Sequence, residues 1–157
     1  MLKIQENKTR KKLRIAQCVF YLMLTVFCSF TFVHIPNPDP SGQDFYATVF
    51  DMLGYMGGDF PNSTLSGSFQ TILPFYFVFL IIPIIGFFFC ALDKERNLKN
   101  IVSIICCLAG VFSILTIVSL NFMDYGSLLS LLLYILTSFI TTIAMMSRLT
   151  KDAEAKV

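Results

Sequence analysis

Few side chains in this 157-residue chain could carry out chemistry: there are five cysteines, and His34 is the one histidine. A single histidine cannot build a typical zinc site. A serine hydrolase needs a base beside its nucleophile, and only His34 could be that base. The chain holds no Cys-x-x-Cys pair, so a thiol oxidoreductase is not expected. Its glycines do not form a phosphate-binding loop before a helix. We therefore predict no catalytic residue, no metal site and no cofactor.

Aspartates form the other chemically capable group. Four aspartates lie in the segment 36–70, which has no basic residue: Asp39, Asp44, Asp51 and Asp59. Their spacings of five, seven and eight residues match no calcium-binding loop. An intramembrane aspartyl protease needs two buried aspartates, and the apolar segments contain none. Solvated loop charge is the preferred interpretation, and an enzyme acting on lipids through these acids is a weak alternative.

The elements that would position these residues are four long apolar runs. The chain is 55% hydrophobic and only 14% charged, against about 25% charged residues in soluble domains. The runs are 15–35, 71–92, 101–123 and 126–146. None contains Asp, Glu, Lys or Arg, and each has the length of about 20 residues that a membrane helix needs. The sequence predicts an all-α, polytopic membrane protein: one domain, a four-transmembrane-helix antiparallel bundle.

The basic residues give the predicted orientation. All twelve Lys and Arg residues lie in 1–14, 93–100 and 147–157, whereas 36–70 and 124–125 have none. Basic segments remain cytoplasmic. We therefore expect a multi-pass protein of the cell membrane whose N- and C-termini are cytoplasmic. The basic N-terminal segment is expected to fix this topology, and a dedicated lipid or partner site is the alternative. No nucleic-acid partner is expected, because no folded domain or aromatic platform accompanies the charge.

The outer loop 36–70 contains a predicted amphipathic helix at 43–56, with Ser41 and Asp44 in capping-box spacing. At 100° per residue, five apolar side chains share one face of this helix. They are Phe45, Val49, Met52, Leu53 and Met56. We expect this helix to lie at the outer membrane surface or to cap the bundle. A binding face for an external partner is the sharper alternative.

Small and weakly polar residues form stripes within the runs. Such residues let membrane helices approach and bond to one another. The stripe of 126–146 comprises Ser127, Ser130, Tyr134, Thr137, Ser138 and Thr141; that of 101–123 includes Ser103, Cys106, Cys107, Gly110 and Ser113; and that of 15–35 comprises Gln17, Tyr21, Thr25 and Cys28. The stripes are predicted to meet inside the bundle as helix-packing contacts. The alternative is that they line a pore.

The run 71–92 is Phe-rich and contains Pro83 near its middle. A mid-helix proline frees the carbonyl four residues earlier, here that of Phe79, and should bend the helix. Pro83 is therefore the predicted hinge. Cys18 and Cys90 lie near the cytoplasmic boundary, where acylation is an alternative to simple burial.

Uncharged spans and the lack of a catalytic constellation favour a function by contact. The predicted function is a non-catalytic accessory or assembly subunit of a membrane complex. Its partners would be the lipid bilayer and another membrane protein or a second copy of itself. The alternative is a small transporter or channel formed by oligomers, which would use Ser130, Thr137 and the bend at Pro83.

Overall fold

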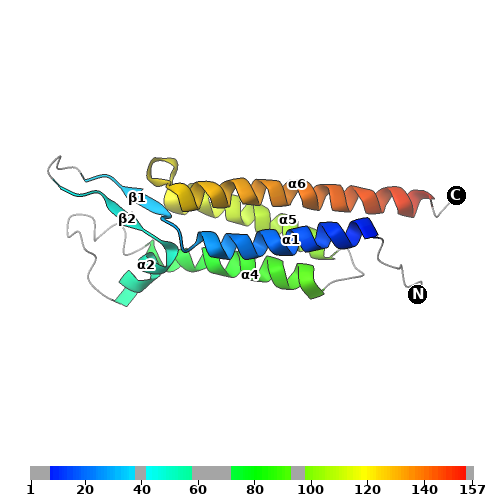
Figure 1. The fold of residues 1–157 in the computed structure, drawn as a ribbon, viewed down its shortest axis with the longest axis horizontal. Coiled ribbons are helices and arrows are strands. Elements are labelled where there is room, and N and C mark those ends of the chain that lie inside the picture. Colours follow the sequence, from blue (N-terminus) through cyan, green and yellow to red (C-terminus); the bar gives the residue numbers. More distant parts are fainter. Residues whose placement is uncertain (1–7, 38–41, 58–71, 93–97, 155–157) are drawn as a thin grey trace.

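The computed structural model of the chain describes residues 8–37, 42–57, 72–92 and 98–154 (Figure 1). It is 81% helical, which confirms the prediction of a mostly helical protein. The elements in chain order are α1 (Lys8–Phe27), β1 (Val33–Ile35), β2 (Phe45–Ala47), α2 (Val49–Gly54), the 3-10 helices η1 (Tyr55–Gly57) and η2 (Leu73–Tyr76), α4 (Phe77–Leu92), α5 (Leu98–Ser113), the π-helix η3 (Ile114–Val118), the 3-10 helix η4 (Leu120–Phe122) and α6 (Tyr125–Glu154).

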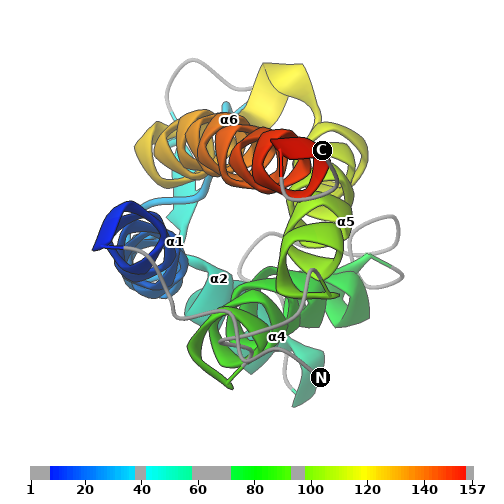
Figure 2. The same ribbon diagram turned by 90° about the vertical axis from the view of Figure 1, so that its right-hand side faces the viewer.

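The four long helices lie side by side around a common axis. Helix α1 packs against α4 and α6, and α5 packs against the same two helices, as the end-on view shows (Figure 2). Helix α1 begins and α6 ends at one end of the molecule, while the two short strands and α2 lie at the other (Figure 1). We call these the inner and the outer end.

Three helical stretches are long and apolar enough to cross a membrane: Leu73–Leu92, Leu98–Val118 and Tyr125–Met146. They correspond to the second, third and fourth apolar runs. Helix α1 does not meet the same criterion in the described structure, because its first two turns carry Lys8, Arg10, Lys11, Lys12 and Arg14.

The first apolar run was expected to be helical as far as Ile35, and this is wrong: the helix ends at Phe27. The chain then turns, with the Ser29 amide donating to the Val26 carbonyl (3.0 Å), and continues as β1. Strand β1 pairs antiparallel with β2. A short apolar run that is rich in β-branched residues can form either a strand or a helix, and here the partner strand decides the outcome.

The expected helix at 43–56 is also corrected. Its first residues form β2, and helix α2 begins only at Val49. The capping box is built by Thr48 and Asp51: the Asp51 amide donates to Thr48 Oγ1 (3.1 Å), and the Thr48 amide donates to Asp51 Oδ2 (2.9 Å). Ser41 lies outside the described residues. Asp44 is engaged in the β1–β2 connection instead.

The last two runs differ from expectation at their ends. Helix α5 ends at Ser113 and continues as the π-helix η3, which ends at Val118. The next residue, Ser119, is a non-glycine residue with a φ of 62°. The third span therefore stops short of Met123, which forms a β-bridge with Val33. Helix α6 extends to Glu154, beyond the expected end at 146.

Two predicted connections are described only in part. The outer loop 36–70 lies outside the described residues at 38–41 and 58–70, and the linker 93–100 lies outside them at 93–97. The rest of that linker, from Leu98 onward, belongs to α5.

Candidate functional site: a buried polar network

Four polar side chains meet in the inner half of the space between the helices. They are Gln17 and Tyr21 on α1, Ser103 on α5 and Thr141 on α6, and each is at most 1% exposed. Gln17 Nε2 donates to Thr141 Oγ1 (2.8 Å), Ser103 Oγ lies 3.0 Å from Thr141 Oγ1, and the Tyr21 hydroxyl lies 2.8 Å from Ser103 Oγ. We refer to these four residues as the inner network. It joins three of the four helices.

The direction of the hydrogen bonds follows from counting protons. Thr141 donates its one hydroxyl proton to the Thr137 carbonyl (2.7 Å), so its oxygen accepts from both Gln17 and Ser103. Ser103 is therefore a donor to Thr141, and Tyr21 donates to Ser103 Oγ. Tyr21 also lies 3.1 Å from the Ser103 carbonyl oxygen. Every hydroxyl proton of the network thus has an acceptor.

Two glycines allow tyrosines to enter the helix interfaces. A Cβ atom added to Gly86 would collide with the Tyr21 ring, and one added to Gly110 would collide with the Tyr134 ring. Both rings are buried. Each glycine therefore accepts an aromatic ring from a neighbouring helix, Gly86 on α4 from α1 and Gly110 on α5 from α6.

The predicted stripes are mostly buried in the structure. Ser127, Ser130, Tyr134, Thr137, Thr141, Ser103, Cys107 and Gly110 are buried. Ser138, in contrast, is half-buried and lines a groove of about 320 Å³ on the outside of α5 and α6, beside exposed Leu108 and Phe139. Thr25 is likewise half-buried and donates to the Leu22 carbonyl of its own helix (2.6 Å).

Sequence reasoning missed Lys99 and Asn100. Both were assigned to the cytoplasmic linker, but they lie in the first turn of α5 and are only 6% and 1% exposed. The signal was present in the spacing, since Asn100 precedes Ser103 by one helical turn and extends the polar stripe of α5 backward.

The carbonyl that the proline of α4 leaves free has a partner in the turn that follows α1. Pro83 is buried within the helix and has no amide proton for the Phe79 carbonyl. The Cys28 thiol lies 3.5 Å from this carbonyl oxygen and donates to it, while sharing its proton with the Leu24 carbonyl (3.4 Å). A thiol directly after the neighbouring helix thus satisfies the acceptor that the proline leaves free. Whether Pro83 acts as a hinge remains a prediction.

At the outer end, His34 and Asp44 hold the connection between β1 and β2. His34 Nε2 lies 3.0 Å from Asp44 Oδ2, and the Asn37 amide donates to Asp44 Oδ1 (3.0 Å). The His34 ring stacks on Tyr46 at 4.5 Å. The Asn37 amide, together with His34, holds the pKa of the Asp44 carboxyl below its usual value.

The five residues of the predicted outer-loop face point mainly into the protein. Val49 and Met52 are buried, Phe45 and Leu53 pack against the core, and Met56 is exposed. The protein itself covers most of this face. In the described part of this region, the exposed apolar side chains are those of Tyr46, Phe50 and Met56.

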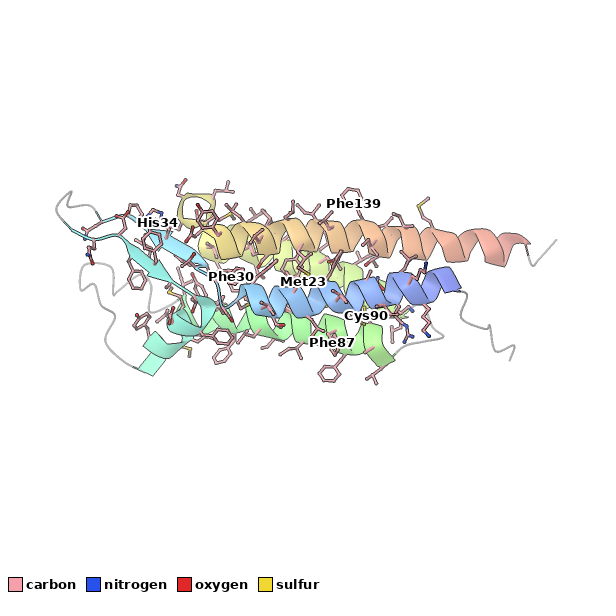
Figure 3. All side chains as sticks on the ribbon, viewed as in Figure 1. Met23, Phe30, His34, Phe87, Cys90 and Phe139 are labelled. Carbon is pink, nitrogen blue, oxygen red and sulfur yellow. The ribbon has the colours of Figure 1, made fainter. Side chains whose placement is uncertain are left out.

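The cysteines near the inner end differ in accessibility. Cys90 has no exposed surface, which leaves no route to an acyl group in the folded protein, and Cys18 is half-buried. Figure 3 shows Cys90 near the inner end and His34 at the opposite one. Beside Cys90, the Arg14 guanidinium donates to the Ala91 carbonyl (3.3 Å) in the last turn of α4, where a cation also favours the helix dipole.

Large apolar side chains cover the outside of the long helices. Phe139 points away from the other helices (Figure 3) and is 65% exposed. Other examples are Val26 on α1, Phe88 on α4 and Phe112 on α5. Among the described residues, no three His, Cys, Asp or Glu side chains come together as metal ligands.

No protein-family model, no curated protein and no solved structure matches this chain.

Proposed function

We propose that this chain is a four-span protein of the cell membrane that acts by contact, as a non-catalytic accessory or assembly subunit of a membrane complex. One observation carries the proposal. The described helices turn large apolar side chains outward, while their buried hydroxyl and amide groups bond mainly across or along the helices. Such a protein has its hydrogen bonding inside and its apolar surface available to lipid or to another membrane helix.

Helix α1 is the proposed fourth span. Its apolar part, from Ile15 to Phe27, is about 20 Å long, which is less than the ~30 Å of a hydrocarbon core. It nevertheless lies between α4 and α6, both of which are apolar enough to cross. The segment after Phe27 continues toward the outer end as the buried chain of Phe32 and Val33. The lysine and arginine residues at the start of α1 would then remain at the cytoplasmic surface.

The orientation can be tested with two variants, each of which adds one exposed cysteine to the five native ones. Tyr46→Cys replaces a 54% exposed residue at the outer end, and Lys12→Cys replaces an exposed residue near the inner end. A membrane-impermeant thiol reagent added to intact cells should label the former and leave the latter unlabelled until the cells are opened. The reverse pattern would contradict the orientation, and equal labelling of both would contradict the spans.

The contact function can be tested with a photoreactive phenylalanine analogue at three matched sites. Phe88, Phe112 and Phe139 are 55%, 68% and 65% exposed and lie on three different helices. In native membranes we expect a stoichiometric protein adduct from the site or sites that face the partner and lipid adducts from the others. Protein retained after mild detergent extraction should be the same partner. Lipid adducts from all three sites, together with a monodisperse and partner-free preparation, would refute the proposal.

An oligomeric transporter or channel is the second candidate, because the inner half of the helix interior is polar. In that case reconstituted liposomes should show solute or ion flux that bulky residues at Ser130 or Thr137 abolish. Absence of flux across a broad solute panel would eliminate this candidate.

A further inference from the structure

Two buried amide oxygens near the inner network have no hydrogen-bond donor. They are Gln17 Oε1 and Asn100 Oδ1, and each residue is 1% exposed. Ser130 Oγ also has no partner, but a serine hydroxyl in a helix can donate to a carbonyl of its own helix after a rotation of its side chain. An amide oxygen can only accept, so each of these two oxygens needs a proton from a donor. A buried water molecule can supply it.

Gln17 belongs to the inner network, and Asn100 lies one helical turn from it toward the inner end. Gln17 bonds to Thr141, which bonds to Ser103, and Asn100 precedes Ser103 by one turn in the first turn of α5. A buried polar group without a hydrogen bond destabilises the folded protein. A buried water molecule typically makes two to four bonds to groups of this kind.

The charges near the two amide oxygens indicate which kind of donor can bind there. Lys99 is 6% exposed in the first turn of α5, and the Arg14 guanidinium donates to the Ala91 carbonyl near the end of α4, so two cationic residues lie at this end. They disfavour a bound cation. Water is the small neutral donor that fits.

We infer that the inner half of the protein is hydrated: water from the cytoplasmic side reaches Asn100, Gln17 and Ser103 and is stopped at Tyr21. Tyr21 closes the path because its ring packs on Gly86 and its hydroxyl is bonded to Ser103. Beyond it, the buried side chains include Leu24, Phe32, Phe79 and Ile114. The inference rests on the orientation proposed above, in which the inner end is cytoplasmic.

Two native thiols form a matched pair of reporters. Cys107 is 1% exposed and lies 3.6 Å from the Tyr21 hydroxyl, at the end of the inner network, while Cys28 is 2% exposed and bonds to the Phe79 carbonyl in the outer half. A small anionic methanethiosulfonate reagent is applied to the cytoplasmic side of vesicles that contain the unaltered chain. Mass spectrometry of the two peptides then gives both rates. We expect Cys107 to react at least tenfold faster than Cys28.

An Asn100→Leu variant separates hydration from general opening of the structure. Removing the unpaired oxygen removes a water site, so the Cys107 rate should fall severalfold while the Cys28 rate stays the same. Equal rates for the two thiols in the unaltered chain, or an unchanged Cys107 rate in the variant, would overturn the inference. If Cys107 reacts only from the opposite side and Asn100→Leu slows that reaction, hydration stands and the proposed orientation falls.

Discussion

The contact between Gly86 and Tyr21 gives the sharpest test of how α1 and α4 pack. In a Gly86→Ala variant the new methyl group would overlap the Tyr21 ring, with the ring Cδ1 atom at 2.8 Å. The ring cannot simply rotate away, because it is fully buried and its hydroxyl is bonded to Ser103. The two helices must therefore separate or the hydrogen bond must break.

The magnitude follows from three terms. Overpacking a filled interior costs about 1–3 kcal/mol, and loss of the tyrosine hydrogen bond costs about 0.5–1.5 kcal/mol. Alanine regains about 1 kcal/mol of helix propensity relative to glycine. The net loss in free energy of unfolding is then about 0.5–3.5 kcal/mol, which corresponds to a fall in Tm of about 1–14 °C for a chain of this size.

Thermal unfolding in detergent can be followed by a thiol-reactive fluorophore, since four of the five cysteines are buried in the folded protein. Gly54→Ala is the matched control, because a Cβ atom there meets nothing within 4 Å, and it should leave Tm unchanged or raise it slightly. Combining Gly86→Ala with Tyr21→Ala should cost less than the sum of the two changes. If Gly86→Ala is as harmless as Gly54→Ala, the described interface is wrong.

Two further outcomes are expected, each with a matched control variant. Thr141→Val leaves two buried donors without an acceptor and should cost about 2–4 kcal/mol of unfolding free energy, whereas Thr116→Val, which removes bonds only within its own helix, should change it little in the same thermal assay. The Asn37 amide proton should titrate with a midpoint below 3.8, because the pKa of Asp44 is lowered from that value in the folded chain. The contribution of Asp44 to the stability of the outer end is therefore present above pH 3.8 and is lost as the pH falls through its lowered pKa. Asp44→Asn should abolish this NMR titration. A midpoint at or above 3.8 would contradict the prediction.

Hydropathy predicted the helical class of the chain, because long apolar runs favour membrane helices and such runs can be read directly from the sequence. The helices that contain Pro83, Ser103 and Thr141 lie where the apolar runs lie. The polar stripes also indicated most of the buried hydroxyls. Helical periodicity could not predict the burial of Ser138. This residue lies at the margin between the interior and the groove on the outside of α5 and α6.

The end of the first run was mispredicted because its conformation depends on a distant segment. Residues 33–35 form a strand only through pairing with residues 45–47, and the Phe32 amide donates to the Ala47 carbonyl (2.8 Å). The same pairing removes the first residues of the expected amphipathic helix. Asn100 was missed for a different reason: charge counting placed it in a loop, although the helix begins before it.

Cys28 connects three parts of the molecule through adjacent atoms of one residue. Its thiol donates to the Phe79 carbonyl at the proline of α4, and its own carbonyl accepts the Val49 amide at the start of α2 (3.1 Å). A change in the tilt of α4 about Pro83 would therefore pull on the short helix over the outer end. This residue therefore links the middle of the helix bundle to the structure at its outer end.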